Sequence, residues 1–419
     1  MKKRVWLAVV LCMVSLHAGF FPSKKEVLVR KAPLMDVRYE KSEALSLLND
    51  IRESMGMNTL IQNDQLSLAA EAHAAYLVRN HVTSHRETPG FPGFTGKTPA
   101  DRALHAGYLS TQVTENLSTK NHDAQSSIDG LFSAIYHRFG FLDVSIDEIG
   151  VGVVQDSKDS DNSAFVYLMG NSHLNDLCRE PPFKGYGKYV YRVCKDSEHR
   201  ISEKRFLAAK DANKRYNPKI VFYPYDGQQN VPPAFYGEIP DPLPDYDVSG
   251  FPVSVTFNDY YFKKVDLISF KLYKNGNKLV PLVRVLTHRS DPHARFTTHQ
   301  FALFPLKRLE YDTDYRAELV YREKGKKKRT SWEFHTRELD EKMFRIKGKE
   351  GTITIQKGKS YQVYLVPLNG HDVIKGVTFP EDVDVTFTDN NTLRVTLMSG
   401  NIRSFDIKSK RRTIHVKVK

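Results

Sequence analysis

The side chains of this sequence that are best suited to chemistry gather in its first third. They are four histidines and one glutamate: His73, His81, His85, Glu115 and His137. Imidazole nitrogens together with a carboxylate form a ligand set for zinc or a similar divalent ion. The same groups form a general acid/base set, because histidine titrates near neutral pH. The residue types alone therefore leave metal binding and proton transfer both open.

Some of these histidines have a simpler structural explanation. His73 lies on the apolar face of a predicted helix, which favours a packed and hydrogen-bonded imidazole. His81 and His85 have the spacing of ligands on one helical turn, but residues 82–84 are poor helix formers. We therefore expect the helix to end near Asn80 and the two histidines not to form a helical zinc pair.

The elements that must position these residues follow from apolar periodicity. The pattern predicts helices over 42–55, 64–80, 98–107 and 124–138, with Ser42 and Thr98 as N-caps. The segments 149–154 and 164–170 read as strands of a hairpin with a polar tip. The predicted helices come first along the chain and the antiparallel strand pair comes late. This order indicates an α+β domain that ends near residue 172.

Six short motifs of this region occur in one order. They are Ala72-His73, Ser84-His85, Pro99–Arg102 with Ala106–Tyr108, Thr114–Leu117, His137-Arg138 and Glu148–Gly152. In this order and spacing the segment resembles the CAP superfamily (cysteine-rich secretory proteins, antigen 5 and pathogenesis-related proteins) in its bacterial exported form. The resemblance covers roughly residues 42–172, which is under a third of the chain.

The resemblance implies an α-β-α sandwich in which His85, Glu115, Asn116 and His137 converge on one cleft. It also implies that Gly150 and Gly152 keep one strand face bare so that another segment can approach closely. His81 stands where the family often has the glycine that ends the helix, and histidine tolerates the left-handed conformation needed there.

The sequence departs from the family pattern at the second cleft glutamate. Family members with the full site place that glutamate on the helix before the last histidine. Here Ser133 stands at this place, Asp129 is the only carboxylate on the helix, and Thr114 replaces a glycine before Glu115. No serine, cysteine or threonine has the setting of an activated nucleophile. These departures favour a binding site over a complete hydrolytic site, and leave open whether the protein is an enzyme.

The N-terminus predicts export. Residues 1–18 combine a basic start with a short apolar run, the pattern of a secretory signal peptide, and residues 19–40 form a basic leader. A retained N-terminal anchor is the alternative to cleavage. Cys178 and Cys194 are the only other cysteines besides Cys12, and such a pair in an exported protein favours one disulfide over two separate thiols. The expected location is the periplasm, cell surface or exterior.

The rest of the chain divides by composition. We expect a CAP domain over 41–172, a disulfide-stapled connector over 173–216, an immunoglobulin-like or fibronectin-like β-sandwich over 217–338 and a small all-β domain over 339–419. The fold class is thus α+β followed by two all-β modules.

The net charge of +13 concentrates in turns and in the C-terminal tail. It suits attraction to anionic envelope polymers or a lipid surface, while an exported protein does not meet nucleic acid. No segment after the signal peptide is apolar for long enough to span a membrane, and the sequence carries no signal for oligomeric state.

Three functional hypotheses follow. The first is an envelope protein whose cleft binds zinc, another divalent cation or a small ligand through His85, Glu115 and His137, with His85 and His137 as the metal ligands. The second is a metal-assisted hydrolase of peptide or envelope polymer with Glu115 as the base. The third is a non-catalytic adhesive or structural protein that acts through its β modules.

Overall fold

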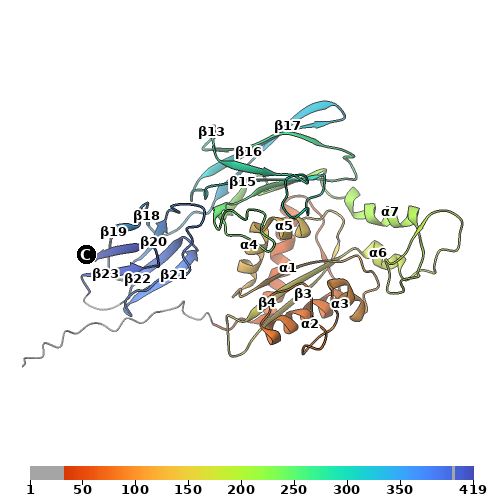
Figure 1. Cartoon of the computed structure of the whole chain (residues 1–419), viewed down its shortest axis with the longest axis horizontal. Coiled ribbons are helices and arrows are strands. Elements are labelled where there is room, and N and C mark those ends of the chain that lie inside the picture. Colours follow the sequence, from red (N-terminus) through yellow and green to blue (C-terminus); the bar gives the residue numbers. More distant parts are fainter. Residues whose placement is uncertain (1–32, 399–401) are drawn as a thin grey trace, which may run out of the picture.

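The computed structural model describes residues 33–398 and 402–419. The expected signal peptide and most of the expected leader lie outside these residues. Figure 1 shows a helix-rich first domain, a middle β domain above it, and a C-terminal β module and a connector at opposite ends of the molecule.

The first domain is a four-stranded sheet between helices. The strand order is β1 (Ile61–Gln62), β3 (Glu148–Gln155), β4 (Ser163–Gly170) and β2 (Thr114–Thr119). The helices are α1 (Val37–Ser54), α2 (Asp64–Asn80), α3 (Pro99–His105), α4 (Ala124–Ser133) and α5 (Ile135–Phe141). β3 and β4 pair antiparallel, so the predicted hairpin is confirmed.

The sandwich follows from strand β4, which is buried along its whole length. Because successive side chains of a strand point to opposite faces, its residues separate into two cores. Phe165, Tyr167 and Met169 pack in the cluster that holds α1 and α4. Val166 and Leu168 pack in the cluster that holds α2. The α+β prediction is confirmed.

The expected close approach at Gly150 and Gly152 is also confirmed. A Cβ atom at Gly150 would lie 2.0 Å from the backbone carbon of Leu66, and one at Gly152 would lie 2.3 Å from that of Ala70. Both contacts are to the backbone of α2. The two glycines therefore let this helix lie directly against strand β3.

The helix ends agree with the sequence in part. Thr98 and Asp101 form a capping box at α3, and His81 ends α2 in the left-handed conformation with φ 52°. The first helix begins earlier than predicted, because Asp36 rather than Ser42 accepts the first backbone N–H groups. The predicted single helix over 124–138 is wrong: the chain leaves the helical conformation at Ala134, with ψ 116°, and restarts as α5.

The connector contains α6 (Ser172–Leu177), the short strands β5 (Tyr189–Val190) and β6 (Ile201–Ser202), α7 (Glu203–Ala212) and a 3-10 turn over Asn213–Arg215. A disulfide joins Cys178 and Cys194, as predicted. It closes the loop between α6 and the segment that contacts the first domain at Ser110.

The middle domain has two main sheets around a common core. One has the order β14 (Val283–Leu286), β15 (Gln300–Pro305), β11 (Val253–Phe257) and β7 (Ile220–Tyr223). The other has the order β13 (Lys278–Leu279), β12 (Asp266–Lys274), β16 (Asp314–Glu323), β17 (Lys326–Thr336) and β8 (Gln228–Val231). β9 (Ala234–Phe235) and β10 (Ser249–Gly250) form a separate pair. The stacked rings of Phe222 and Trp332, 4.3 Å apart, join the two sheets.

The C-terminal module also has two sheets around its own core. The first has the order β18 (Met343–Ile346), β20 (Ser360–Leu365), β22 (Thr392–Leu397) and β21 (Val383–Asp389). The second has the order β19 (Glu350–Ile355), β24 (Thr413–Val418) and β23 (Ser404–Lys408). Across residues 33–398 and 402–419, no helix is both long and apolar enough to cross a membrane.

The contact between α2 and β3 gives a test of the fold. We expect Gly152→Ala to lower the free energy of unfolding by about 1–3 kcal/mol, because its methyl group has to displace helix backbone. Gly130→Ala is the matched control: nothing lies within 4 Å of its added Cβ, so the change in α4 should stabilise by about 0.5–1 kcal/mol. Urea unfolding measures both. Equal effects of the two substitutions would contradict the close packing.

Candidate functional site

His85 is held by a buried carboxylate. Its Nδ1 lies 2.9 Å from Oε1 of Glu115. Strand β2 carries Glu115, whose side chain is 1% exposed, whereas the side chain of His85 is 43% exposed. The other oxygen of Glu115 accepts a hydrogen bond of 2.6 Å from Arg102 of α3. The two oxygens of Glu115 are therefore directed at His85 and Arg102, and His85 is the member that solvent reaches.

A second histidine–carboxylate pair supports the loop that carries His85. The Nδ1 of His73 lies 2.9 Å from Glu87, and its Nε2 donates to the carbonyl of Ser84 at 3.0 Å. Glu87 also accepts from the backbone N–H groups of Thr95 and Gly96. The prediction that His73 is a packed, hydrogen-bonded residue is confirmed, and its role is to hold the loop in place.

The charges around Glu115 keep it ionised. Burial on its own would raise the pKa of this carboxyl, but the hydrogen bond from His85 and the charges of His73 and Arg102 together lower the pKa below its usual 4.5. Glu115 is thus an anion at neutral pH.

His137 is held by a carboxylate from a different domain. Its Nδ1 lies 2.9 Å from Oε2 of Glu238, which belongs to the proline-rich segment that follows β9. The side chain of Glu238 is 2% exposed, and that of His137 is 14% exposed. Glu238 also accepts hydrogen bonds from the backbone N–H groups of Ile135 and Tyr136, at 2.6 and 3.2 Å. A residue of the middle domain therefore both orients His137 and caps α5.

The two imidazoles lie side by side. The ring centroids of His85 and His137 are 6.2 Å apart, and the ring planes are inclined by 24°. Asn116 donates to the carbonyl of His137 at 2.7 Å, which joins β2 to α5. We call His85, Glu115, His137 and Glu238 the histidine cluster. When Nδ1 carries the proton that binds the carboxylate, Nε2 of each neutral ring keeps a lone pair.

This arrangement can be compared with known proteins. Residues 45–171 match the family described as the cysteine-rich secretory protein family, CAP. Residues 45–171 form a CAP domain.

Three solved structures are similar to parts of the chain. An outer surface protein from Borrelia burgdorferi has 18% identity and a TM-score of 0.29, over 36% of this chain and 98% of that one. An extracellular SCP-domain protein from Bacillus anthracis has 20% identity and a TM-score of 0.28, over 33% and 44%. A cysteine-rich secretory protein from Staphylococcus aureus has 17% identity and a TM-score of 0.22, over 33% and 40%. The chain thus spans less than half of the last two, and no curated protein matches it.

The three-ligand set expected from His85, Glu115 and His137 is not formed. Both carboxylate oxygens of Glu115 already have a partner, Oε1 in His85 and Oε2 in Arg102. Within the described part of the chain, no group of three or more histidine, cysteine, aspartate or glutamate side chains is arranged to hold a metal ion. The donors that the CAP domain offers at this cluster are the two imidazoles.

Glu238 was not among the site residues predicted from the sequence. Asp129, the carboxylate on the helix before His137, pairs instead with Arg337 of the middle domain at 3.3 Å, and Ser133 donates to the carbonyl of Gly130. The only signal for Glu238 was the lack of a glutamate on that helix. Nothing in the local sequence indicated that a residue about a hundred positions later would take its place.

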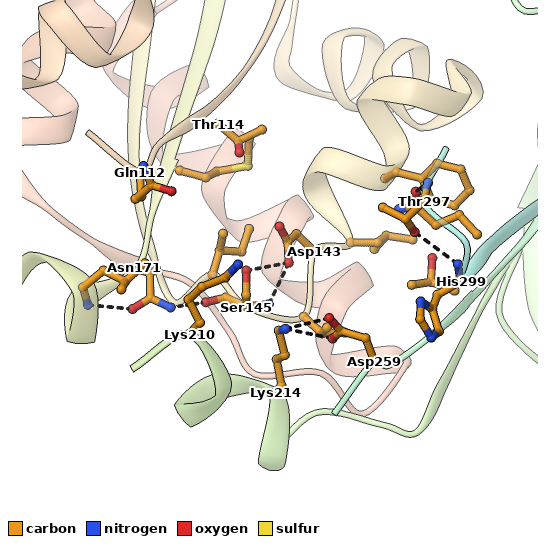
Figure 2. A pocket seen from close by; sticks show the side chains of 18 of the residues that line it. Gln112, Thr114, Asp143, Ser145, Asn171, Lys210, Lys214, Asp259, Thr297 and His299 are labelled. Atoms are coloured by element: carbon orange, nitrogen blue, oxygen red, sulfur yellow. Dashed lines mark hydrogen bonds and ion pairs between the residues drawn. The ribbon is translucent and has the colours of Figure 1, made fainter. Parts of the chain in front are cut away.

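A separate hollow of about 500 Å³ lies where the CAP domain, α7 and the middle domain meet. Figure 2 shows that several of its charged and polar groups are partnered within the cavity wall. Lys214 pairs with Asp259 at 2.8 Å, and Asp143 accepts from the backbone and hydroxyl of Ser145 at 2.8 Å. This hollow does not include the histidine cluster.

The anion at Glu115 makes the stability depend on pH. Because its folded pKa lies below 4.5, its contribution is complete above that pH and is lost as pH falls through the folded value. We expect the free energy of unfolding of the wild type to fall steeply below about pH 4.5, and that of Glu115→Gln to fall less steeply from a lower value at pH 7. Urea unfolding between about pH 3 and 7 measures this. If the free energies of unfolding of the wild type and of Glu115→Gln changed in parallel with pH, the prediction would be wrong.

Glu238 gives a second prediction. Replacing its carboxylate by the neutral amide of Glu238→Gln weakens three hydrogen bonds at once, so we expect a loss of about 1–3 kcal/mol in the free energy of unfolding. Glu333→Gln, on an exposed strand position of the same domain, is the matched control and should change little. An unfolding midpoint that is the same for both variants would show that the bridge to α5 contributes nothing.

Proposed function

We propose that this protein is an exported CAP-domain protein of the cell envelope whose His85 and His137 bind a divalent metal ion, with zinc as the first candidate. The observation that carries the proposal is that each imidazole is oriented through Nδ1 by its own buried carboxylate, Glu115 for one and Glu238 for the other. Carboxylate–histidine pairs of this kind fix the ring and make the free nitrogen a better ligand.

The spacing of the rings supports the proposal. Zinc–nitrogen bonds are about 2.0–2.1 Å, so two imidazoles on one ion place their ring centroids about 5–6 Å apart. The separation in the structure is 6.2 Å, close to this range, and His85 is the more exposed of the two rings. A pair of protein ligands leaves further positions of the ion for water or a small ligand. A bound zinc ion would supply Lewis-acid character there.

The hydrolase alternative has less support. It requires Glu115 to act as a base, but both oxygens of Glu115 accept hydrogen bonds from cationic or potentially cationic groups. The lowered pKa of this carboxyl also makes it a weaker base. No observation favours the adhesive alternative over binding at the histidine cluster.

Export is supported by three observations. The cysteine pair forms a disulfide, a bond that persists in oxidising compartments. The N-terminal residues have the composition of a signal peptide. The family that matches residues 45–171 is described as secretory.

Zinc titration of the tag-free protein by calorimetry tests the proposal. We expect one zinc site in the wild type and a loss of zinc affinity of roughly tenfold or more in the double variant His85→Ala with His137→Ala. We also expect Glu238→Gln to lose about 10–100-fold in zinc affinity, because removing a residue that hydrogen-bonds to a metal-ligating histidine typically has this effect.

The matched control is His122→Ala. His122 is a histidine of the same domain whose side chain is 37% exposed and faces Asp161. It should leave the titration unchanged. If the double histidine variant binds zinc as tightly as the wild type, the proposed site is wrong.

A further inference from the structure

A second hollow of the molecule lies between the middle domain and the C-terminal module, away from the histidine cluster. Its volume is about 610 Å³. The segment after β15, the end of β18 and the loop after β20 form most of its wall, and Tyr246, Val248 and Leu282 complete it. We propose that this hollow, the basic junction pocket, binds a sugar-sized molecule that carries a carboxylate or phosphate group.

The wall of the pocket has an excess of positive charge. Four cationic residues line it, namely Lys307, Arg308, Arg345 and Lys347. The one lining carboxylate is Glu310, which already pairs with Arg345 at 3.0 Å and with Lys274 at 2.6 Å. Among the described residues, neither Lys307 nor Lys347 has an ion pair. An anion that enters the pocket could therefore bind Lys307 and Lys347 without breaking an existing ion pair.

The surrounding acidic groups do not cancel this charge. Asp245 and Asp247 flank Tyr246 but pair with Arg284 and His371, both at 3.4 Å. Asp389 lies behind the wall and pairs with Arg308. Asp245 and Asp389 are thus each paired with an arginine, and Asp247 with a histidine, so the two lysines without an ion pair contribute a net positive potential to the pocket.

A buried cation fixes one wall. The side chain of Arg308 is 1% exposed, and its guanidinium lies 4.5 Å from the ring of Tyr311 and 4.4 Å from the ring of Tyr364. Asp389 also accepts hydrogen bonds from Tyr236 and Tyr311. Two further lining residues are joined directly, because the N–H of Val248 donates to the carbonyl of Gly370 at 2.9 Å. The pocket is therefore formed before any ligand arrives, which reduces the entropy lost on binding.

The lining indicates the chemistry of the ligand. Charge-assisted hydrogen bonds from lysine and arginine suit carboxylate or phosphate oxygens. The rings of Tyr246 and Tyr364 and the side chains of Leu282, Leu306 and Leu368 provide apolar contact for a compact organic body. The volume is within the range of small-molecule sites, about 300–1,000 Å³. A flat lipid surface would not use such a hollow, so we favour an acidic sugar, free or as the end of a polymer.

Calorimetry with the full chain tests this inference. The probes are glucose 6-phosphate, galacturonate trimer, polygalacturonate, inorganic phosphate and vesicles of phosphatidylcholine with phosphatidylglycerol. The pocket variant is Lys307→Glu with Lys347→Glu; both positions are exposed, so the fold should persist, and thermal unfolding checks this. The matched control is Lys326→Glu with Lys327→Glu at the exposed β16–β17 hairpin, which changes the net charge equally.

We expect the sugar probes to bind the wild type, and the pocket variant to lose roughly tenfold or more in affinity, since two charge-assisted contacts are reversed. The control should lose about twofold or less at moderate salt, because screening weakens distant charges. Tighter binding of polygalacturonate than of the trimer would identify a polymer as the source, and equal binding per site a free sugar.

Several outcomes would overturn the inference. Equal losses in the pocket variant and the hairpin control would mean general charge attraction. Inorganic phosphate that binds as tightly as glucose 6-phosphate would remove the sugar component. Loss of vesicle binding alone in the pocket variant would indicate a membrane surface instead. None of these results depends on zinc binding at His85 and His137, so this test and the zinc titration fail separately.

Discussion

The architecture of the candidate site depends on the contact between Glu238 and helix α5. Ala134, the N-cap residue of α5, has no polar side chain, so the first N–H groups of this short helix need an acceptor from elsewhere. Glu238 supplies it and binds the imidazole of His137 with the same carboxylate. Glu238 of the middle domain thus fixes both the first residue of α5 and the orientation of the imidazole ring of His137. The CAP domain and the middle domain form this part of the site together.

The residue after His137 makes the same connection through burial. Arg138 is fully buried and donates to the carbonyls of Phe132 and Pro252, the second of which belongs to the middle domain. Its guanidinium also lies over the rings of Tyr223 and Phe251. Burial lowers the pKa of Arg138 to about 9, a cost that these carbonyls and rings offset. One hydrophobic cluster continues from the CAP domain into both middle sheets, so separation of the domains would expose a buried cation together with apolar surface.

The sequence predicted features that depend on neighbouring residues, but it did not predict contacts between residues far apart in the chain. The helix over 64–80, the left-handed His81 and the close approach at Gly150 and Gly152 follow from propensity, capping and the absence of side chains, all of which act over a few residues. The interruption at Ala134 was missed, because apolar periodicity continues through it while the cause lies in the middle domain. The ion pairs of Asp129 with Arg337 and of His137 with Glu238 join residues that no spacing relates. A composition shift indicates where a domain border falls, but it carries no information on which side chains cross that border.

Both groups of ionisable side chains with potential for binding lie at borders between modules. Glu238 of the middle domain binds His137 of α5, and Asp389 of the C-terminal module accepts a hydrogen bond from Arg308 of the middle domain. In each case the carboxylate of one module binds a cationic or potentially cationic group of the other. A neighbouring side chain is reached by solvent: His85, which is partly exposed, or Lys307, which is exposed. Placing such groups at a border requires the modules to dock before either site is complete. Because binding to a docked form stabilises that form by mass action, a ligand at either border would strengthen the association of the modules there. Both proposed sites therefore depend on contacts between the modules and not on the CAP domain or a β module alone.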